Sequence, residues 1–351
     1  MRRIYKNADL GDRITDITVE DGVFVSLEPT DEAGEDLAGA RVRPGLIEIH
    51  AHGCLGYDTM EPGHLDEMSA FWAQHGITAW LPTTMTMGMD DIRAALAQPV
   101  GGRPGCAEVV GFHLEGPYIA MKYKGAQNPD FVKTPDLEEF RSLPNVTLVT
   151  LAPEVEGALD FIRECDACVA LGHTAADYDC CLQAAEAGAK CLTHMFNAMS
   201  GIHHRNPGPI GAAVTADMYV QLIGDGLHVH PAVMLAAWRM FGTDRLVLIS
   251  DALRATGLAP GEYLFGGQHI RVDGGLCKLD DGTIAGSITT LHECVLRAVK
   301  AGIPADDAWR CASQTPAEML GLKKGRIEVG YDAEFVVTDT ELRVLRTVTK
   351  Y

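Results

Sequence analysis

Several features that would define a class of protein are missing from this sequence. It has no apolar run of about 18 residues, the length that a membrane-spanning helix needs, and MRRIYKNADL lacks the apolar stretch of a signal peptide. No Gly-x-Gly-x-x-Gly follows the first strand predicted in the central part, so nothing indicates nucleotide binding. Basic residues are scarce, with 29 Lys and Arg against 48 Asp and Glu, and the net charge of −19 argues against general binding to nucleic acid or anionic membranes.

The ten cysteines lack the spacing of a disulfide framework. Cys165 and Cys168 form a Cys-x-x-Cys pair that could hold zinc or act in redox chemistry, but no partner pair accompanies it. We therefore predict that the cysteines pack as small apolar side chains in a reducing compartment, the cytoplasm.

Both ends of the chain are predicted to form short strands separated by turns. Residues 1–43 show no helical period, and turn residues such as Asp21 and Gly22 interrupt their apolar stretches. So short a β segment cannot build a stable core alone, and residues 323–351 have the same character. We predict a small β-sandwich domain made of residues 1–43 and 323–351, with residues 44–322 inserted between its two parts.

The central part alternates apolar strands with helices. Strands are expected at 46–50, 77–84, 107–115, 146–152, 168–173, 189–194, 219–224 and 246–251. Helices are expected between most of them, among others at 64–76, 90–98, 154–165, 177–188 and 231–242. Eight strands alternating with helices predict an α/β fold of the (β/α)8 TIM-barrel type, and a doubly wound open sheet is the structural alternative.

Helix boundaries carry local signals. Asp90 is a candidate N-cap, Pro231 is expected in a first helical turn, and Gly76 and Gly188 are expected to end helices. These signals support the division of the central part into strand and helix units.

The region after the eighth strand differs from this alternation. Residues 263–287 are glycine-rich and predict a β-hairpin insertion, either a lid over the site or a surface feature. Helices are expected at 289–301 and 305–313, and Thr315 with Glu318 matches a capping box that would open one last short helix.

Metal-ligand side chains recur where the predicted strands end. The first strand ends in His50-Ala51-His52, and a strand points residues two apart to the same face. Glu115, His173, His194 and Asp251 end later strands, and His228 follows the seventh. In a (β/α)8 barrel these ends share the rim that holds the active site. Any one of them alone is better explained as a structural group, but together they predict a metal centre.

The residue types narrow the choice of metal. Imidazole and carboxylate without thiolate suit zinc, iron, manganese or cobalt. Zinc leads because open His and carboxylate sites are its common catalytic form. Such an ion supplies hydroxide at neutral pH and polarises a carbonyl, which is the chemistry of hydrolysis.

Longer motifs carry a resemblance to a known family. They are, in chain order, PGLIEIHAHG, HLEGPY, LGHTAADYD, THMFNAM with HRNPGPIGAA, DGLHVHP, SDALRATG and GTIAGS. Together they resemble the N-acetylglucosamine-6-phosphate deacetylases of the amidohydrolase superfamily. The resemblance implies metal-dependent hydrolysis of the acetamide of N-acetylglucosamine 6-phosphate, giving glucosamine 6-phosphate and acetate in amino-sugar catabolism, by a homodimer.

The resemblance also implies roles at the metal centre. Glu115, His173 and His194 would hold the principal ion. His50 and His52 are both present, so the resemblance allows one or two ions per subunit, with Glu115 bridging the pair where a second is held. Asp251 would join the ligands and act as the catalytic acid–base, and His228 would polarise the acetyl carbonyl and stabilise the oxyanion.

The family pattern places Asn197 and Ala198 beside the sugar phosphate and Arg205 on the phosphate itself. Further substrate contacts are assigned by the same correspondence to Ala126, Gln127, His228, Ile284, Ala285 and Gly286. Arg205 has independent support because its planar fork suits phosphate and an acidic protein needs a local cation there. Its other interpretation is a solvated loop arginine. In family dimers, some phosphate contacts come from the neighbouring subunit.

One position departs from the family. Where members often have Lys-Gly-x-His-Asn-Pro, this chain has Lys-Gly-Ala-Gln-Asn-Pro, and Gln127 can donate a hydrogen bond but carries no charge. An alternative function is therefore deacetylation of N-acetylgalactosamine 6-phosphate or of another N-acyl amino-sugar phosphate. A more remote alternative is a catalytically silent barrel that acts as a binding protein.

Overall fold

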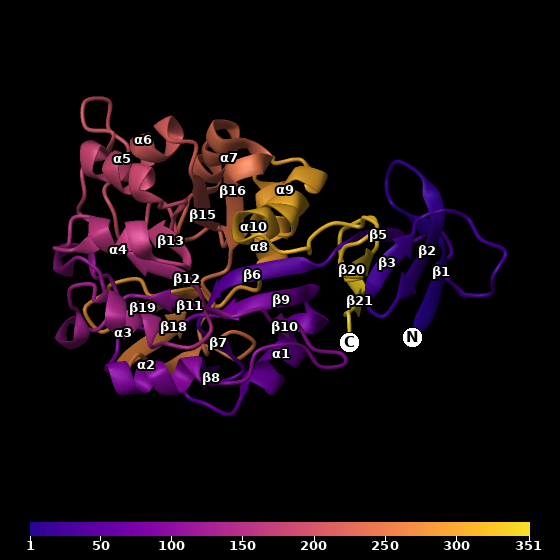
Figure 1. Cartoon of the computed structure of the whole chain (residues 1–351), viewed down its shortest axis with the longest axis horizontal. Helices are drawn as coiled ribbons and strands as arrows, with labels where there is room; N and C mark the ends of the chain where they lie inside the picture. The colour runs from indigo at the N-terminus through magenta and orange to yellow at the C-terminus, as the bar shows by residue number, and fades with distance from the viewer.

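The computed structural model describes residues 1–351, and both ends of the chain lie together in one sheet beside the larger body (Figure 1). This sheet contains β1 (Arg2–Asp9), β2 (Ile14–Glu20), β3 (Val23–Ser26), β4 (Glu35–Asp36), β5 (Arg41–Pro44), β20 (Phe335–Thr338) and β21 (Val344–Val348). Antiparallel pairing of β5 with β20 joins the N-terminal strands to the C-terminal ones. Ile17, Phe24 and Phe335 are fully buried and belong to a core of the sheet's own.

The strands of the body are parallel and divide into two sheets. One contains β6 (Leu46–Ala51), β9 (Ile77–Pro82) and β10 (Glu108–Val109). The other contains β11 (Phe112–Glu115), β12 (Val146–Leu151), β13 (Cys168–Leu171), β14 (Cys191–Leu192), β15 (Tyr219–Ile223) and β16 (Leu246–Ile249). Single parallel bridges connect the two sheets, from Thr83 to His113 and from Ala51 to Ala252. The fold is thus mixed α/β, and its parallel strands do not form one continuous ladder.

The predicted strand 107–115 is the place where the two sheets separate. It is interrupted at Gly111, so that β10 pairs with β9 while β11 pairs with β12. Gly111 has φ +127°, and a Cβ there would lie 1.8 Å from the Thr147 Oγ1. Only glycine fits this turn, and the apolar pattern across it cannot show that the chain changes sheets.

A buried apolar cluster lies on the inward face of the parallel strands and contains side chains from both sheets. It includes Ile47, Leu81, Leu148 and Ile249, and Met319 of the last helix contributes from one end. A larger cluster fills the space between the strands and the surrounding helices. The inward face of the strands therefore forms a close-packed apolar core, which gives rigid support to polar side chains at the ends of the strands.

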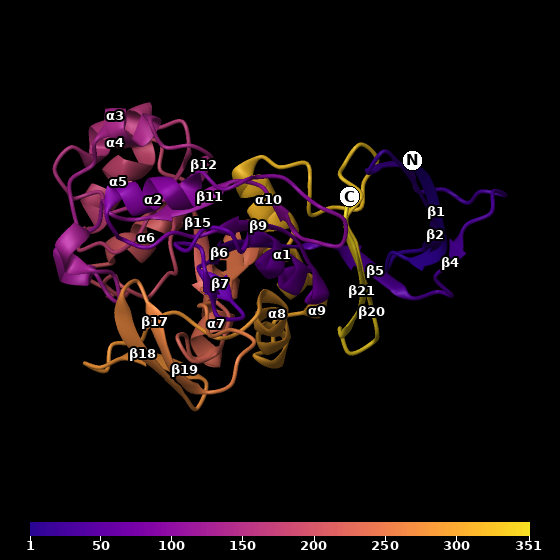
Figure 2. The same ribbon diagram turned by 90° about the horizontal axis from the view of Figure 1, so that it is seen from below.

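Helices surround the strands of the body (Figures 1 and 2). They are α1 (Leu65–Gln74), α2 (Met89–Leu96), α3 (Leu137–Arg141), α4 (Ala158–Glu164), α5 (Tyr178–Ala187), α6 (Gly208–Thr215), α7 (Pro231–Arg245), α8 (Leu291–Lys300), α9 (Ala305–Cys311) and α10 (Gln314–Leu320), with 3-10 turns η1 (Met121–Tyr123) and η2 (Pro129–Phe131). None of these helices has the length and apolar character needed to cross a membrane.

Some predicted boundaries are correct and others are wrong. Pro231 opens α7, and Gly188 caps α5. Asp90 lies in the first turn of α2 and is not its N-cap, which is Gly88.

The predicted capping box is also wrong, because the Thr315 hydroxyl donates to the carbonyls of Thr243 and Arg310. A true capping box opens α8, where Thr290 and Glu293 hydrogen-bond each other's backbone N–H groups. The same four-residue pattern therefore caps a helix only where the preceding backbone is extended, as at Thr290.

The glycine-rich region after β16 forms a three-stranded antiparallel sheet of β17 (Gly261–Phe265), β18 (Gln268–Asp273) and β19 (Leu276–Leu279). In Figure 2 it lies along the lower side of the body. Phe265 and Ile270 are buried in a small cluster with Met85 and Leu253 of the body. A separate short pair, β7 (Gly53–Cys54) and β8 (Tyr57–Asp58), follows the first strand of the body.

Candidate metal and active site

Six predicted ligands converge at the ends of the parallel strands. They form two adjacent groups, His50, His52 and Asp251 in one, and Glu115, His173 and His194 in the other. Within each group the ligand atoms lie within 4.8 Å of one another, and all six residues are buried. The structure thus brings together every residue that the sequence predicted as a metal ligand.

Glu115 stands between the two groups. Its Oε1 lies 3.2 Å from the Nε2 of His173, 3.0 Å from that of His194 and 3.3 Å from that of His50. Its Oε2 lies 3.3 Å from the His52 Nε2. One carboxylate therefore faces both groups, the position that a bridging ligand needs.

The histidine tautomers can be worked out from the partners of the other ring nitrogen. The Nδ1 atoms of His52, His173 and His194 face the backbone carbonyls of Thr83, Tyr123 and Asn197, respectively. The His50 Nδ1 faces the side-chain oxygen of Gln221 at 3.0 Å. Because these oxygens accept hydrogen bonds, each Nδ1 carries the proton and each Nε2 presents a lone pair to the centre.

This donor set fits a divalent cation. Four imidazole lone pairs and two carboxylates meet in a buried space, and the His50 Nε2 has no hydrogen-bond partner. The Nε2 atoms of His173 and His194 lie only 3.1 Å apart, a repulsive contact for two lone pairs unless a cation lies between the ligands. The chemistry of the ligands agrees with zinc, iron, manganese or cobalt.

The electrostatics of the cluster point to the same conclusion. Burial opposes charge on His52, but hydrogen bonds and attraction from Asp251 and Glu115 raise its pKa to about 10, so its Nε2 holds a proton until a metal ion takes the place of that proton. Burial likewise opposes charge on Glu115, yet His50, His173 and His194 hold its pKa well below the ordinary range. The carboxylates are thus ionised and attract positive charge to this point.

The backbone at the strand ends explains how the side chains reach the centre. His173, His194 and Asp251 have left-handed φ angles of 48°, 29° and 51°. These residues leave the regular strand conformation directly after β13, β14 and β16, and this turns their side chains toward the rim. Strain of this kind is typical of functional positions.

His228 is held by a neighbour that the sequence analysis did not assign. Asp225 Oδ2 lies 2.7 Å from the His228 Nδ1, and its Oδ1 accepts from the backbone N–H groups of Leu227 and His228. The His228 Nε2 lies 2.9 Å from the Ala285 carbonyl. Burial lowers the pKa of His228, but Asp225 outweighs it and raises the pKa above the ordinary value. Both ring nitrogens face acceptors, so His228 is positioned as a hydrogen-bond donor.

A pocket of about 190 Å³ opens beside the six ligands. It is lined by His52, Glu115, Gly125, Ala126, Gln127, His173, His194, Asn197, Ala198, Ile223, His228, Asp251, Phe265, Thr283, Ile284, Ala285 and Gly286. The list includes every predicted substrate contact except Arg205. Phe265 was not predicted, and it packs edge-on against the His52 ring with centroids 5.3 Å apart. The glycine-rich insertion is thus a wall of the pocket.

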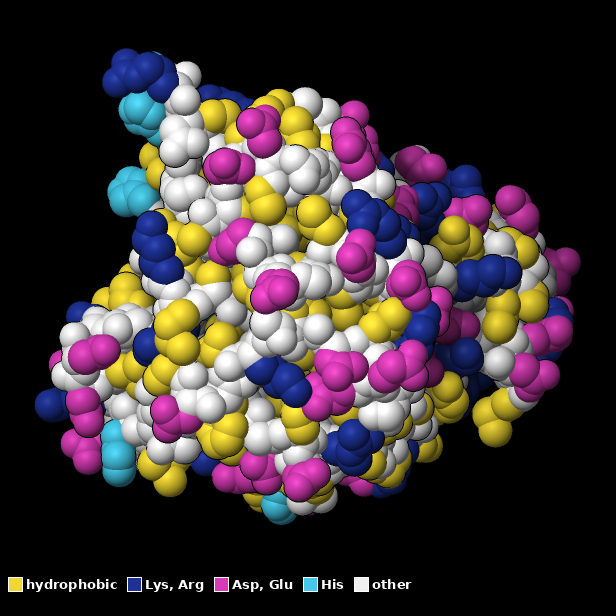
Figure 3. Space-filling model, turned by 60° about the vertical axis from the view of Figure 1, so that its left-hand side comes forward, with side chains coloured by type: hydrophobic (Ala, Val, Ile, Leu, Met, Phe, Trp, Pro, Cys, Tyr) yellow, Lys and Arg dark blue, Asp and Glu magenta, His cyan; other side chains and the backbone are white.

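No lysine or arginine lines this pocket. Arg205 lies in the exposed loop 201–206, where its Nη1 contacts the His204 ring. Figure 3 shows a protrusion on which histidine side chains lie beside a basic side chain. Within one chain, the structure therefore does not bring Arg205 to the predicted substrate residues.

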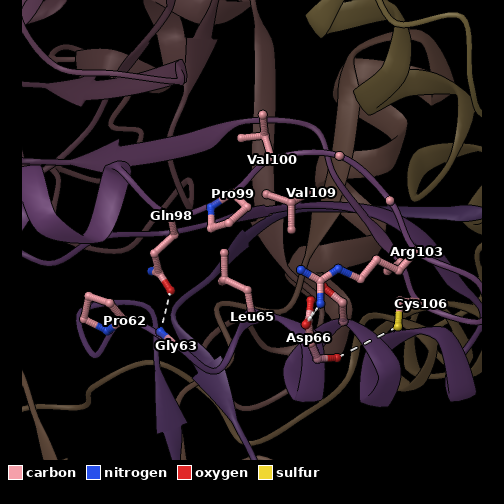
Figure 4. A pocket seen from close by; sticks show the side chains of 14 residues that line it. Pro62, Gly63, Leu65, Asp66, Gln98, Pro99, Val100, Arg103, Cys106 and Val109 are labelled. Carbon is pink, nitrogen blue, oxygen red and sulfur yellow. Dashed lines mark hydrogen bonds and ion pairs between the residues drawn. The ribbon is translucent and has the colours of Figure 1, made fainter.

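A second cavity, of about 390 Å³, lies between α1 and the segment 98–109 (Figure 4). Its polar groups pair with one another: Arg103 with Asp66, and the Gln98 side chain with the backbone N–H of Gly63. None of the six ligands lines it, so it offers no alternative catalytic centre.

Comparison with known proteins agrees with this site. The Amidohydrolase family matches residues 41–350. N-acetylglucosamine-6-phosphate deacetylase from Vibrio furnissii is 41% identical over 329 residues, 88% of this chain and 81% of the relative. N-acetylgalactosamine-6-phosphate deacetylase from Escherichia coli O157:H7 is 36% identical over 346 residues, 93% of this chain and 91% of the relative.

A solved structure is similar over almost the whole chain. It is a mutant of N-acetyl-D-glucosamine-6-phosphate deacetylase from Mycobacterium smegmatis in complex with N-acetyl-D-glucosamine-6-phosphate. The TM-score is 0.90 at 31% identity, covering 99% of this chain and 98% of that one. The chain therefore belongs to the amidohydrolase family, in the group that contains the N-acetylglucosamine-6-phosphate deacetylases.

Proposed function

We propose that this chain is a metal-dependent deacetylase that hydrolyses N-acetylglucosamine 6-phosphate to glucosamine 6-phosphate and acetate, in amino-sugar catabolism in the cytoplasm. The observation that carries the proposal is the convergence of four imidazole nitrogens and two carboxylates beside a pocket, in a chain 41% identical to a deacetylase of that name. The intact ligand set argues against a catalytically silent binding protein.

Metal binding is assigned to the two groups that meet at Glu115. Glu115, His173 and His194 would hold the principal ion, and His50, His52 and Asp251 a second one, with zinc the leading candidate. A divalent ion bound there lowers the pKa of water and polarises a carbonyl oxygen.

Two side chains are assigned catalytic roles: Asp251 transfers the proton, and His228 stabilises the developing negative charge. In the proposed reaction a water oxygen attacks the acetyl carbon, and Asp251 accepts a proton from that water. As the C–N bond breaks, Asp251 returns the proton to the departing amine, leaving acetate. His228, fixed by Asp225, would exchange the hydrogen bond from its Nε2 to the Ala285 carbonyl for one to the acetyl oxygen as negative charge develops there.

The phosphate of the substrate needs a cation that the pocket of one chain lacks. We propose that the functional unit is a homodimer in which Arg205 of the exposed loop reaches the neighbouring subunit's pocket. The absence of lysine and arginine from the pocket lining supports this arrangement, as does the position of Arg205 on an exposed loop. Asn197, Ala198, Ile284 and Gly286 would form the sugar and phosphate walls.

The architecture is proposed as a (β/α)8 barrel of residues 44–322 with a β-sandwich of residues 1–43 and 323–351. In support, bridges connect the two parallel sheets at both of their edges, and one apolar cluster contains residues of both. The terminal strands have a buried core separate from that of the body.

A second candidate substrate is N-acetylgalactosamine 6-phosphate, because a deacetylase for that sugar is 36% identical over 93% of this chain. Acetate release from both epimers and from unphosphorylated N-acetylglucosamine would separate the candidates, with the enzyme assayed as purified and after adding zinc or manganese. We expect release only from the phosphorylated gluco sugar. A preference for the galacto sugar would select the second candidate. Absence of both bound metal and acetate release would favour the binding protein.

A further inference from the structure

A cavity of about 370 Å³ lies where the terminal sheet meets the body. Its lining includes Arg13, Arg41 and Arg43 from the terminal part and Arg310 of α9, and we call it the arginine cavity after these four residues. It shares no residue with the pocket at the metal ligands. Nothing in the proposed deacetylation uses it.

The arginine cavity gathers arginines in an acidic protein. Four arginines line it, against two acidic residues, Asp12 and Asp306, and it has no lysine, histidine or glutamate. Asp9 and Asp244, outside the lining, pair with Arg41 and Arg310, so four carboxylates balance the four guanidinium charges. The group is thus neutral, whereas the whole chain carries −19, and an anion meets less repulsion here than the overall charge implies.

The arginines also have more hydrogen-bond donors than the protein uses. Each guanidinium has five N–H donors, about 15 for Arg41, Arg43 and Arg310 together. These three residues make four hydrogen bonds in total, to Asp9, Asp306 and Asp244. The Nε of each is buried without a partner. This surplus favours a ligand rich in acceptors.

The existing ion pairs are weak or shared. Arg41 and Arg43 both contact the same oxygen of Asp306, at 3.5 and 2.5 Å, and the Asp306 side chain is 71% exposed. Arg43 also lies over the buried Trp309 ring, 5.3 Å from its centroid. Trp309 in turn donates to the Pro44 carbonyl at 2.8 Å. Packing therefore fixes Arg43, while Arg41 and Arg310 keep N–H donors, among them their buried Nε groups, that no protein acceptor pairs with.

We propose that the arginine cavity binds a phosphoryl-type oxyanion that bridges β5 and α9. An ion with oxygens on every side suits guanidinium groups that approach from two elements and keep unpaired N–H donors. Binding at this junction ties the terminal sheet to the body and stabilises the folded chain.

Inorganic phosphate is the probe for this site, with chloride at equal ionic strength as the reference. Phosphate should raise the Tm of the wild type by about 2 °C or more in a saturable way. The double variant R41Q/R310Q should lose the saturable rise and keep wild-type kcat/KM for acetamide hydrolysis. R163Q, which removes an exposed arginine of α4 paired with Asp160, is the matched control and should behave as the wild type. A saturable rise of the full wild-type size retained in R41Q/R310Q would overturn the proposal, since any phosphate bound at the active site raises the Tm of all three proteins alike.

A second variant tests the site by a gain in affinity. Asp306→Asn removes the exposed carboxylate that competes for Arg41 and Arg43. The phosphate concentration at half-saturation should then fall about three- to five-fold. Glucosamine 6-phosphate is tested beside inorganic phosphate, and because it is also the proposed product of the active site, only a shift that R41Q/R310Q abolishes would identify a phosphorylated metabolite as the ligand of the arginine cavity. An unchanged or higher half-saturation in Asp306→Asn with both probes would contradict an anion site.

Discussion

Gln127 donates a hydrogen bond from its Nε2 to Glu115 Oε2 over 2.7 Å. The backbone N–H of Thr86 donates to the Gln127 Oε1, also over 2.7 Å, and this fixes which end of the amide faces the carboxylate. Gln127 is buried, with only 3% of its surface exposed. Gln127, which was predicted to contact the sugar or its phosphate, thus lines the pocket and also orients the Glu115 carboxylate.

Replacing Gln127 by Ala should weaken metal binding. Loss of the hydrogen bond frees Glu115 to rotate away from the ligand atoms of the histidines, and loss of such a supporting partner lowers metal affinity about 10- to 100-fold. Competition with a chromophoric zinc chelator measures the effect. Gln268→Ala is the matched control, because Gln268 donates to the Ala126 carbonyl next door and does not touch Glu115. If Gln127→Ala keeps the wild-type metal affinity but has a raised KM, the result would show that Gln127 binds the substrate and does not support the metal ligands.

Replacing Asp251 by Asn should separate catalysis from metal binding. Asparagine keeps the shape of the side chain but cannot accept and return a proton, so kcat should fall about 10²- to 10⁴-fold. The ion held by Glu115, His173 and His194 should remain, as measured by metal analysis of the purified variant. Asp66→Asn, in the cavity of Figure 4, is the control for a generic loss of carboxylate. Turnover near that of the wild type would contradict the assigned role.

The sequence predicted the convergence of the six ligand side chains because its signal is local and repeated. Each ligand lies at the end of an apolar strand, and parallel strands bring such ends to one edge whatever the details of their pairing. His50, His52 and Glu115 could therefore be placed together without a structure. Asp225 was missed because an Asp before a helix is ordinarily a cap or a turn residue, although its Asp-x-x-His spacing to His228 is a usable signal.

Other features depend on contacts between residues far apart in the sequence. The interruption at Gly111 follows from its close approach to Thr147, which no pattern near Gly111 reveals. The orientation of Gln127 follows from the backbone N–H of Thr86, 41 residues away. For the same reason, the motif around Arg205 suggested phosphate binding but could not show that Arg205 is exposed and absent from the lining of its own pocket.

Acid should weaken the terminal sheet through Asp16. Burial raises the pKa of Asp16, but hydrogen bonds from Lys6 and from the backbone N–H groups of Thr30 and Asn7 outweigh it and lower the pKa below its ordinary value. A lowered folded pKa stabilises the folded state above about pH 4, and the stabilisation is lost as the pH falls through the folded pKa.

Asp16→Asn should therefore lower the free energy of unfolding at pH 7 by about 1–3 kcal/mol, and the gap to the wild type should narrow below about pH 4. Thermal unfolding of both proteins at a series of pH values measures the gap. Asp160→Asn, an exposed carboxylate on α4, is the control. A gap that stays constant down to pH 3 would show that packing, and not ionisation, accounts for the effect.

Arg205→Ala tests whether Arg205 recognises the phosphate of the substrate. The variant should raise KM for N-acetylglucosamine 6-phosphate far more than for the unphosphorylated sugar, because only the phosphate uses the guanidinium. Arg239→Ala, an exposed arginine on α7, is the control. Equal effects on both sugars would mean that Arg205 does not touch the phosphate.

Mixing two defective variants then locates the arginine. In a symmetric dimer that exchanges subunits, an Arg205→Ala subunit keeps Asp251 and can borrow Arg205 from an Asp251→Asn partner, so each mixed dimer has one complete site. Random exchange at equal amounts makes half of the dimers mixed, and activity at low substrate should recover to about a quarter of the wild-type value. An arginine that served its own subunit would give no recovery, because every site would then lack either Arg205 or Asp251. Recovery in the mixture, with neither variant active alone at that substrate concentration, would therefore assign Arg205 to the neighbouring subunit's pocket.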